Sequence, residues 1–265
     1  MSRPLAILAA LSLTVTNLGA IEIIAHRGAS EDAPENTMAS FREGWKQQAD
    51  ADELDIHLSK DGEVIVMHDA STKRTAGIDQ PIATQTLEEL KALDAGKWKS
   101  PQWTGEKIPT LAEVLATIPD NRRLFIEIKC GPEVLPKLTE VMRASGKKAE
   151  QLVIIGFSYA TMKKAKELYP QQPVYWLASP PSEKSKEKTP TIEELIAMSK
   201  DAKLDGLDLS SKFTFDAGEV AKAKAAGLKM YAWTVNDAAT AKALVALGYD
   251  GITTNRPAWL REQLK

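Results

Sequence analysis

Cysteine and concentrated positive charge are both scarce in this sequence of 265 residues. The one cysteine, Cys130, has no partner for a disulfide bond within the chain. Its scarcity neither supports nor excludes export to an oxidising compartment. The formal net charge is −2 and the basic residues are dispersed rather than clustered. A nucleic-acid-binding surface requires a basic stripe or patch, so we expect no nucleic-acid partner.

Long apolar runs are also missing, except near the N-terminus. There, Arg3 precedes an apolar stretch from Leu5 to Val15, and the small residues Gly19 and Ala20 follow. This order is typical of a secretory signal peptide, and the run is too short for a membrane span of ~20 residues. We therefore expect residues 1–20 to be a signal peptide and the mature chain to be periplasmic or extracellular, with no stable membrane span. A helix that caps the end of a barrel is the alternative interpretation of residues 1–20.

From residue 21 onward, short apolar runs alternate with stretches that have helical spacing. The apolar runs predict eight strands, at Ile21–Ala25, Glu53–Leu58, Leu124–Ile128, Leu152–Phe157, Val174–Leu177, Gly206–Leu209, Lys229–Thr234 and Gly251–Thr253. The helical patterns cover Thr37–Gln48, Glu133–Ala144, Thr161–Tyr169, Ile192–Ser199, Asp216–Ala226 and Asp237–Leu247. Alternating strands and helices indicate a parallel sheet, and eight strands in ~240 residues favour a closed (β/α)8 TIM barrel of the α/β class.

One interval interrupts this alternation. Between His68 and Leu111 the sequence shows no clear strand–helix unit but is rich in Thr, Gly, Lys and Trp. A long irregular segment inside a compact domain is usually functional or a small inserted subdomain. We therefore predict one barrel domain over residues 21–265, with a small insertion after the second strand at about residues 70–108.

Carboxylates stand at the ends of two predicted strands. Glu53 and Asp55 alternate along the second strand, as Glu127 and Lys129 do along the third, so the members of each pair face the same side. Three carboxylates in a barrel mouth would resist ionisation unless a cation lay between them, and an all-oxygen ligand set favours Mg²⁺ or Ca²⁺ over zinc. Lys129 would add positive charge suited to an anionic phosphate. A structural ion network is the alternative.

All three histidines of the chain lie between residues 26 and 68. His26 and His68 each follow an apolar run, and two histidines beside a carboxylate cluster favour a base and an acid, because imidazole titrates near neutral pH. Arg27 offers a forked donor for phosphate oxygens. His57 shares a face with the strand carboxylates, and its involvement is left open at this point.

The order of these motifs resembles that of glycerophosphodiester phosphodiesterases. The matching segments are His26–Gly28, Pro34–Thr37, Glu53-x-Asp55, Lys60–Gly62, His68–Asp69, Glu127-x-Lys129, Trp233–Asn236, Asp250–Ile252 and Arg256–Pro257. They span nearly all of the expected mature chain. The resemblance implies a (β/α)8 barrel with an insertion after the second strand, in agreement with the alternation of strands and helices.

The resemblance also implies a role for each matching position. The general acid–base pair would be His26 and His68. The ligands of one divalent metal ion, Mg²⁺ or Ca²⁺, would be Glu53, Asp55 and Glu127. The substrate-binding residues would be Arg27 and Lys129 for the phosphate and Trp233 as an apolar wall. The segment Pro34–Thr37 is expected to start the first helix, with Glu35 reaching toward the site.

The predicted reaction is metal-dependent hydrolysis of a small glycerophosphodiester to an alcohol and glycerol 3-phosphate. A lysophospholipase D activity and a non-catalytic phosphoester-binding barrel are the alternatives. A serine esterase is disfavoured: Gly156–Ser158 resembles a nucleophile elbow, but such enzymes need a histidine after the serine, and every histidine precedes Ser158. The oligomeric state is not predicted.

Overall fold

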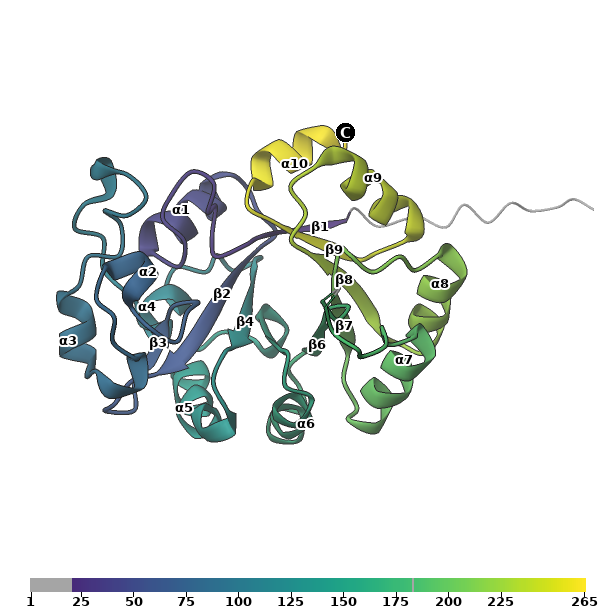
Figure 1. Ribbon diagram of the computed structural model, residues 1–265, viewed down its shortest axis with the longest axis horizontal. Helices are drawn as coiled ribbons and strands as arrows, with labels where there is room; N and C mark the ends of the chain where they lie inside the picture. The colour runs from purple at the N-terminus through teal and green to yellow at the C-terminus, as the bar shows by residue number, and fades with distance from the viewer. Residues whose placement is uncertain (1–20, 183) are drawn as a thin grey trace, which may run out of the picture.

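A computed structural model describes residues 21–182 and 184–265, and the predicted signal peptide lies outside them. In the described part of the chain, parallel strands form a closed ring (Figure 1). These strands are β1 (Glu22–Ala25), β2 (Ala51–Leu58), β4 (Arg123–Ile128), β5 (Leu152–Gly156), β6 (Val174–Ala178), β7 (Gly206–Ser210), β8 (Lys229–Trp233) and β9 (Gly251–Thr254). The ring closes because β1 pairs in parallel with both β2 and β9. The predicted (β/α)8 barrel is confirmed, and every predicted strand overlaps an observed one.

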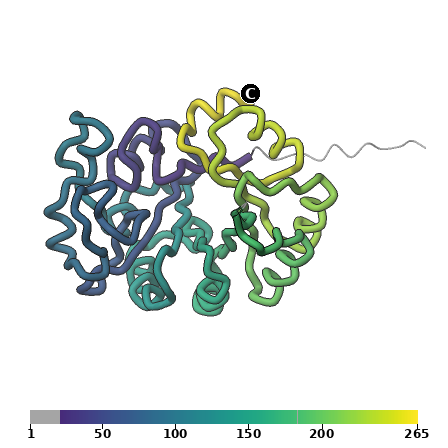
Figure 2. The backbone as a smooth tube through the Cα atoms, viewed as in Figure 1, coloured from purple at the N-terminus to yellow at the C-terminus, as the bar shows by residue number. Residues whose placement is uncertain are grey.

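Helices surround the ring and connect its strands, as the backbone trace also shows (Figure 2). They are α1 (Met38–Lys46), α5 (Leu135–Ala144), α6 (Tyr159–Leu168), α7 (Ile192–Asp201), α8 (Ala217–Ala225), α9 (Ala238–Leu247) and α10 (Pro257–Gln263). The six predicted helices are all present, whereas α10 and the short α4 (Leu111–Leu115) were not predicted. Each of these two has only a turn or two, which is too short for helical periodicity to show in the sequence.

Several helices begin where the sequence supplies a cap. The Thr37 side chain accepts a hydrogen bond from the Ser40 amide, and Thr191 does the same for the Glu194 amide. Such caps satisfy backbone donors that have no partner within the helix, and each stabilises by about 1 kcal/mol. The predicted role of Pro34–Thr37 in starting the first helix is therefore observed.

The lower part of the barrel is filled, so the ring is not a pore. Its interior holds the buried side chains of Ile24, Phe125, Val153, Tyr175 and Tyr231. Burying side chains of this size contributes about 1.5–3 kcal/mol each. Polar side chains replace this apolar filling at the carboxyl ends of the strands, where a cavity opens.

The predicted insertion is also present and adds one strand that was not predicted. The apolar run at β3 (Val64–Val66) pairs antiparallel with β2. The chain then forms α2 (Lys73–Ala76), η1 (Ile82–Thr84), α3 (Leu87–Ala92) and η2 (Pro101–Trp103), which lie beside α1 at one flank of the barrel (Figure 1). A small core around Ile65, Ile82, Leu90 and Ile108 holds these pieces together.

None of the helices in the described ranges is long and apolar enough to span a membrane.

Candidate active site

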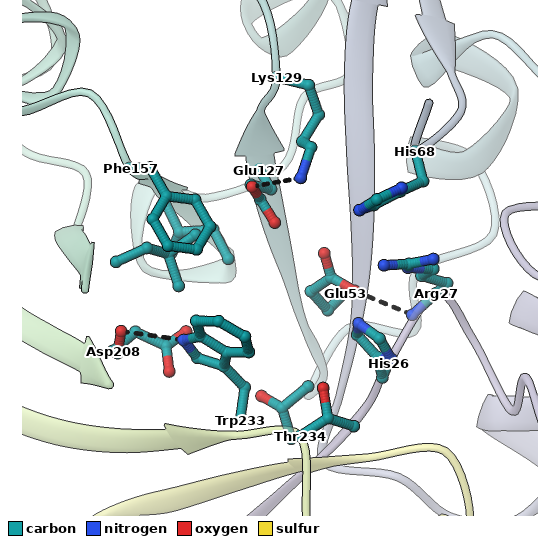
Figure 3. A pocket seen from close by; sticks show the side chains of 13 residues that line it. His26, Arg27, Glu53, His68, Glu127, Lys129, Phe157, Asp208, Trp233 and Thr234 are labelled. Carbon is teal, nitrogen blue, oxygen red and sulfur yellow. Dashed lines mark hydrogen bonds and ion pairs between the residues drawn. The ribbon is translucent and has the colours of Figure 1, made fainter. Parts of the chain in front are cut away.

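A cavity of about 280 Å³ opens at the carboxyl ends of the barrel strands (Figure 3). The structure brings all eight predicted site residues together there. Seven of them line the cavity, namely His26, Arg27, Glu53, His68, Glu127, Lys129 and Trp233. The eighth, Asp55, is only 1% exposed and contacts the side chains of Arg27 and Lys129 at the cavity.

The turn after β1 directs His26 and Arg27 into the cavity. Gly28 has a φ of +76°, and a Cβ atom there would lie 2.4 Å from the Ser40 carbonyl carbon. Only glycine combines that backbone conformation with so close an approach. Arg27 itself has a φ of 57°, and its amide donates a 2.9 Å hydrogen bond to Glu53 Oε2. The predicted His26–Gly28 motif is thus a tight turn anchored on the carboxylate cluster.

Glu53, Asp55 and Glu127 form a compact carboxylate cluster, in which one oxygen of each lies within 4.8 Å of the others. Burial and the neighbouring charges of Asp55 and Glu127 raise the pKa of Glu53 well above its usual range. Burial and the charge of Asp55 raise the pKa of Glu127 to about 7. Burial opposes ionisation of Asp55 as well, but Arg27 and Lys129 hold its pKa below the ordinary value.

A divalent cation fits this cluster. Asp55 Oδ1 is buried and accepts no hydrogen bond from any described residue. Carboxylates crowded so closely repel one another, and a cation between them relieves the repulsion. The donors are all oxygen atoms, which suits Mg²⁺ or Ca²⁺. Glu53, Asp55 and Glu127 are therefore the residues that could hold a metal ion.

Two cations flank the cluster. Lys129 Nζ lies 2.8 Å from Glu127 Oε1 and 3.6 Å from Asp55 Oδ1. Arg27 Nε lies 3.3 Å from Asp55 Oδ2. With a metal ion held between the carboxylates, both cations would be free to pair with an additional anion. A phosphate group matches this surplus of positive charge.

His26 has a neutral partner. Its Nδ1 lies 2.7 Å from the Asn255 amide oxygen, which leaves Nε2 available to a substrate. Burial, followed by the adjacent charge of Arg27, lowers the pKa of His26 to about 4. His26 is therefore uncharged at neutral pH, the form that accepts a proton.

His68 has a charged partner. Its Nδ1 lies 2.6 Å from Asp69 Oδ1. Asp69 also accepts a 2.7 Å hydrogen bond from Arg74 Nε, and this bond is the main reason that its pKa falls to about 2. A carboxylate so placed fixes the orientation of an imidazole and stabilises a positive charge on it. The buried ring of His57 hydrogen-bonds the backbone carbonyl of His68 at 3.1 Å, so it helps to fix the backbone position of His68.

Arg74 in α2 connects the insertion to both sides of the site. Its guanidinium forms two 2.8 Å hydrogen bonds with Glu35 in addition to its contact with Asp69. Glu35 in turn accepts a 2.7 Å hydrogen bond from Arg27 Nη1. A continuous chain of ion pairs and hydrogen bonds therefore runs from Arg27 to His68. The expected reach of Glu35 into the site is observed through this contact with Arg27.

Sequence reasoning assigned no role to four polar residues of this site. Asn255 and Asp69 orient the two histidines, Arg74 links Asp69 to Glu35, and the Asn36 side chain donates a 2.8 Å hydrogen bond to Asp55. Asn36 and Asp69 lie inside recognised motifs, so position alone could have flagged them. Nothing in the sequence marks Arg74, because its partners lie up to 39 residues away.

Aromatic side chains form the wall of the cavity that faces Arg27 (Figure 3). Trp233 and Phe157 pack edge to face with ring centroids 5.5 Å apart, and the Trp233 ring is anchored by a 3.1 Å hydrogen bond to the Asp208 carbonyl. Cys130 follows Lys129 on the opposite face and packs against the apolar core outside the ring. Ser158 accepts a hydrogen bond from the Thr161 amide as the N-cap of α6, a structural role.

A barrel with clustered carboxylates, two histidines and two cations at one open end defines a class of hydrolases that act on phosphate esters. Comparison with known proteins identifies the particular family. The family model described as "Glycerophosphoryl diester phosphodiesterase family" matches residues 26–259. The chain belongs to this family and is a phosphoric diester hydrolase.

Similar proteins carry the same description. The glycerophosphodiester phosphodiesterase of Caldanaerobacter subterraneus is 32% identical over 244 residues, covering 90% of this chain and 95% of that protein. The Bacillus subtilis glycerophosphodiester phosphodiesterase is 33% identical over 251 residues, covering 88% and 83%. Among solved structures, an Oleispira antarctica phosphodiesterase in complex with the product sn-glycerol-3-phosphate matches with a TM-score of 0.82 at 32% identity, covering 92% of this chain and 96% of that one.

Proposed function

We propose that this enzyme hydrolyses glycerophosphodiesters to an alcohol and glycerol 3-phosphate, with a divalent metal ion and a pair of histidines in different roles. The observation that carries the proposal is the arrangement of His26 and His68 in one cavity beside the carboxylate cluster, with two cations adjacent. The Oleispira antarctica enzyme, similar over most of its length, was solved with sn-glycerol-3-phosphate bound, which supports the choice of product.

Arg27 and Lys129 would hold the phosphate. Both lie beside the carboxylate cluster. Arg27 stands across the cavity from Phe157 and Trp233 (Figure 3). A guanidinium offers paired donors to phosphate oxygens, and an ammonium offers a point charge. The aromatic wall would cover the apolar edges of both alcohol moieties of the substrate, with Trp233 beside the glycerol and Phe157 beside the departing alcohol.

Glu53, Asp55 and Glu127 would hold the metal ion, Mg²⁺ or Ca²⁺. When bound, a divalent ion neutralises charge on the phosphoryl oxygens and orients them for displacement. It would also restore the ionised state of Glu53 and Glu127, whose pKa values are raised by burial and by the neighbouring carboxylates.

The two histidines would then divide the proton transfers. His26 is neutral and would remove the proton from the attacking oxygen, which is water or a hydroxyl of the substrate's own glycerol. His68, paired with Asp69, would donate a proton to the departing alkoxide. If the glycerol hydroxyl is the attacking group, a cyclic phosphate would form first and water would then open it.

The direct test is a coupled assay for glycerol 3-phosphate release from glycerophosphocholine and glycerophosphoethanolamine. Metal-stripped protein should be inactive, and Mg²⁺ or Ca²⁺ should restore release. Glu127→Gln should raise the metal concentration needed for half-maximal activity by ~10-fold or more, because it removes a charged ligand. Release by stripped protein without added metal would contradict the metal requirement. Release only from lysophospholipids would instead identify the lysophospholipase D alternative.

Export of the mature chain is part of the same proposal. It is based on the order of charge, apolar run and small residues in the first twenty positions. Mass spectrometry of the protein recovered from its native host would show an N-terminus close to residue 21. Recovery of the intact chain from the cytosol would contradict export.

A further inference from the structure

A buried carboxyl group in the wall of the cavity has no part in the mechanism above. Asp208 lies in β7 with 1% of its surface exposed, and it lines the cavity. Its Oδ1 atom is buried and has no hydrogen-bond partner among the described residues. A buried polar atom without a partner is destabilising, so its presence at a ligand cavity indicates a partner supplied by the ligand.

A second buried carboxyl group provides a useful contrast. Asp52 in β2 is 0% exposed, and both of its carboxyl oxygens lack partners. It points out of the barrel toward α1, where a Cβ atom on Gly44 would lie 2.1 Å from its Oδ1. Asp52 is thus enclosed between a strand and a helix with no space for a ligand, whereas Asp208 borders a cavity.

The position of Asp208 relative to the other site residues limits what it can contact. It lies across the cavity from Arg27 and His68, beside the ring of Trp233 (Figure 3). Within the sheet it pairs with Leu177 and Tyr231, well inside the barrel. A phosphate held by the cations would therefore stand away from Asp208, and the carboxyl group would meet a more distant part of the substrate.

The depth of Asp208 points to the glycerol rather than to the second alcohol. Alcohols that vary between substrates need room at the open mouth, where Phe157 is 45% exposed. The glycerol is common to all glycerophosphodiesters and suits the enclosed end. A hydroxyl group both donates and accepts hydrogen bonds, so it satisfies a carboxyl group whether that group is protonated or ionised.

We propose that Asp208 is a specificity-determining residue that hydrogen-bonds the terminal hydroxyl of the glycerol moiety, while Trp233 covers the carbon chain beside it. This inference rests on the proposed function, since it assumes that a glycerophosphodiester is the substrate. Such a contact would let the enzyme distinguish glycerol from an alkyl alcohol of similar length. Burial, and then the negative charge of Glu127, raise the pKa of Asp208 well above its usual range, which also suits a neutral hydroxyl partner.

The test compares two substrates on the metal-loaded enzyme. One is glycerophosphoethanolamine, and the other is 2-hydroxypropyl phosphoethanolamine, which lacks only the terminal hydroxyl. The wild-type enzyme should prefer the first. Asp208→Ala should lower kcat/KM for the first by about 10- to 100-fold, mainly through KM, and should leave the second nearly unchanged. Asp208→Asn keeps a donor and an acceptor and should retain most of the preference.

Controls separate this role from a structural one. Asp52→Asn replaces the other buried carboxyl group with an amide and should not change the preference. Removing an unpartnered carboxyl group should not lower the melting temperature of the Asp208 variants. An equal loss on both substrates would overturn the proposal.

A binding measurement keeps the proposal testable if the proposed reaction fails. Calorimetry would compare sn-glycerol 3-phosphate with 2-hydroxypropyl phosphate on wild type and Asp208→Ala. Wild type should bind sn-glycerol 3-phosphate about 10-fold or more tightly than the deoxy compound, and the variant should not distinguish them. Equal binding of both compounds by the wild type would overturn the role of Asp208 without bearing on catalysis.

Discussion

His26 and His68 occupy one cavity but have different surroundings. His26 follows the barrel strand β1, its ring is paired with a neutral amide, and burial lowers its pKa to about 4. His68 follows β3, is 31% exposed in its side chain, and is paired with a carboxylate. The proposed mechanism assigns the two histidines opposite proton transfers, and the difference between them lies in their partners rather than in their own chemistry.

The supporting structure of the two residues differs as well. Asn255, the partner of His26, follows the last barrel strand, so the barrel itself orients His26. Asp69 is held by Arg74 from the insertion, and Arg74 also holds Glu35. The insertion therefore completes the surroundings of His68, which suggests why a barrel with sufficient strands of its own carries this extra segment.

The largest expected effect separates the two roles directly. His26→Ala and His68→Ala should each reduce turnover of glycerophosphocholine by about 10²- to 10⁴-fold, the usual contribution of a positioned acid or base. With glycerol phosphate p-nitrophenyl ester, the leaving group needs no protonation. His68→Ala should then recover most of its activity, whereas His26→Ala should not.

Steady-state kinetics on both substrates would measure this difference. A recovery by His26→Ala instead would exchange the two assignments. Recovery by neither variant would show that His68 does not protonate the leaving group. His57→Gln is a useful comparison, because its amide can place a donor near the position of Nε2 toward the His68 carbonyl, and it should cost far less than either alanine variant.

An intermediate effect is expected from the partners of His68. Asp69→Asn should lower kcat by about 10- to 100-fold, because the imidazole loses the carboxylate that orients it and stabilises its charge. Arg74→Met should cost about 10-fold, since Asp69 and Glu35 both lose a partner but stay in place.

The same pair of substrates checks the origin of these losses. Both variants should regain activity on the p-nitrophenyl ester, as His68→Ala does. Asp79→Asn is the matched control, because Asp79 lies in the same insertion but its side chain contacts Lys73 and Ser71 at the surface, away from His68. If Asp79→Asn lost as much activity as Asp69→Asn, the effect would reflect the stability of the insertion and not the orientation of His68.

The barrel was predictable because its pattern is local. Each parallel strand is buried on both faces, so it stands out as a short apolar run such as Leu152–Gly156. The carboxylates on β2 and β4 were predictable for a related reason. Alternation along a strand decides which side chains share a face, and Asp55 and Glu127 stand opposite each other in the register.

Contacts between distant segments were not predictable in this way. The Asn255 side chain reaches His26 across 229 positions, and Arg74 reaches Glu35 across 39. No spacing rule connects such residues, since only closure of the barrel and packing of the insertion bring them together. Asp208 was missed because a strand aspartate gives no sign in the sequence of whether it faces a cavity or a helix.

The smallest expected effect is a shift in pH dependence, and it tests whether the partner sets the role. A general base must be neutral, and the pKa of His26 is lowered to about 4. In the wild type, kcat/KM should therefore decline on the acidic side only as the pH approaches that value. Asn255→Asp replaces the amide with a carboxylate, which favours the charged imidazolium and raises the pKa of His26. The acidic decline should then begin about one to two pH units higher, with activity near pH 8 much less affected.

Asn255→Ala removes the hydrogen bond without adding charge, so it should lower activity without moving the decline upward. Profiles of kcat/KM from pH 4 to pH 9 would measure both variants, and an unshifted profile in Asn255→Asp would show that His26 is not the base.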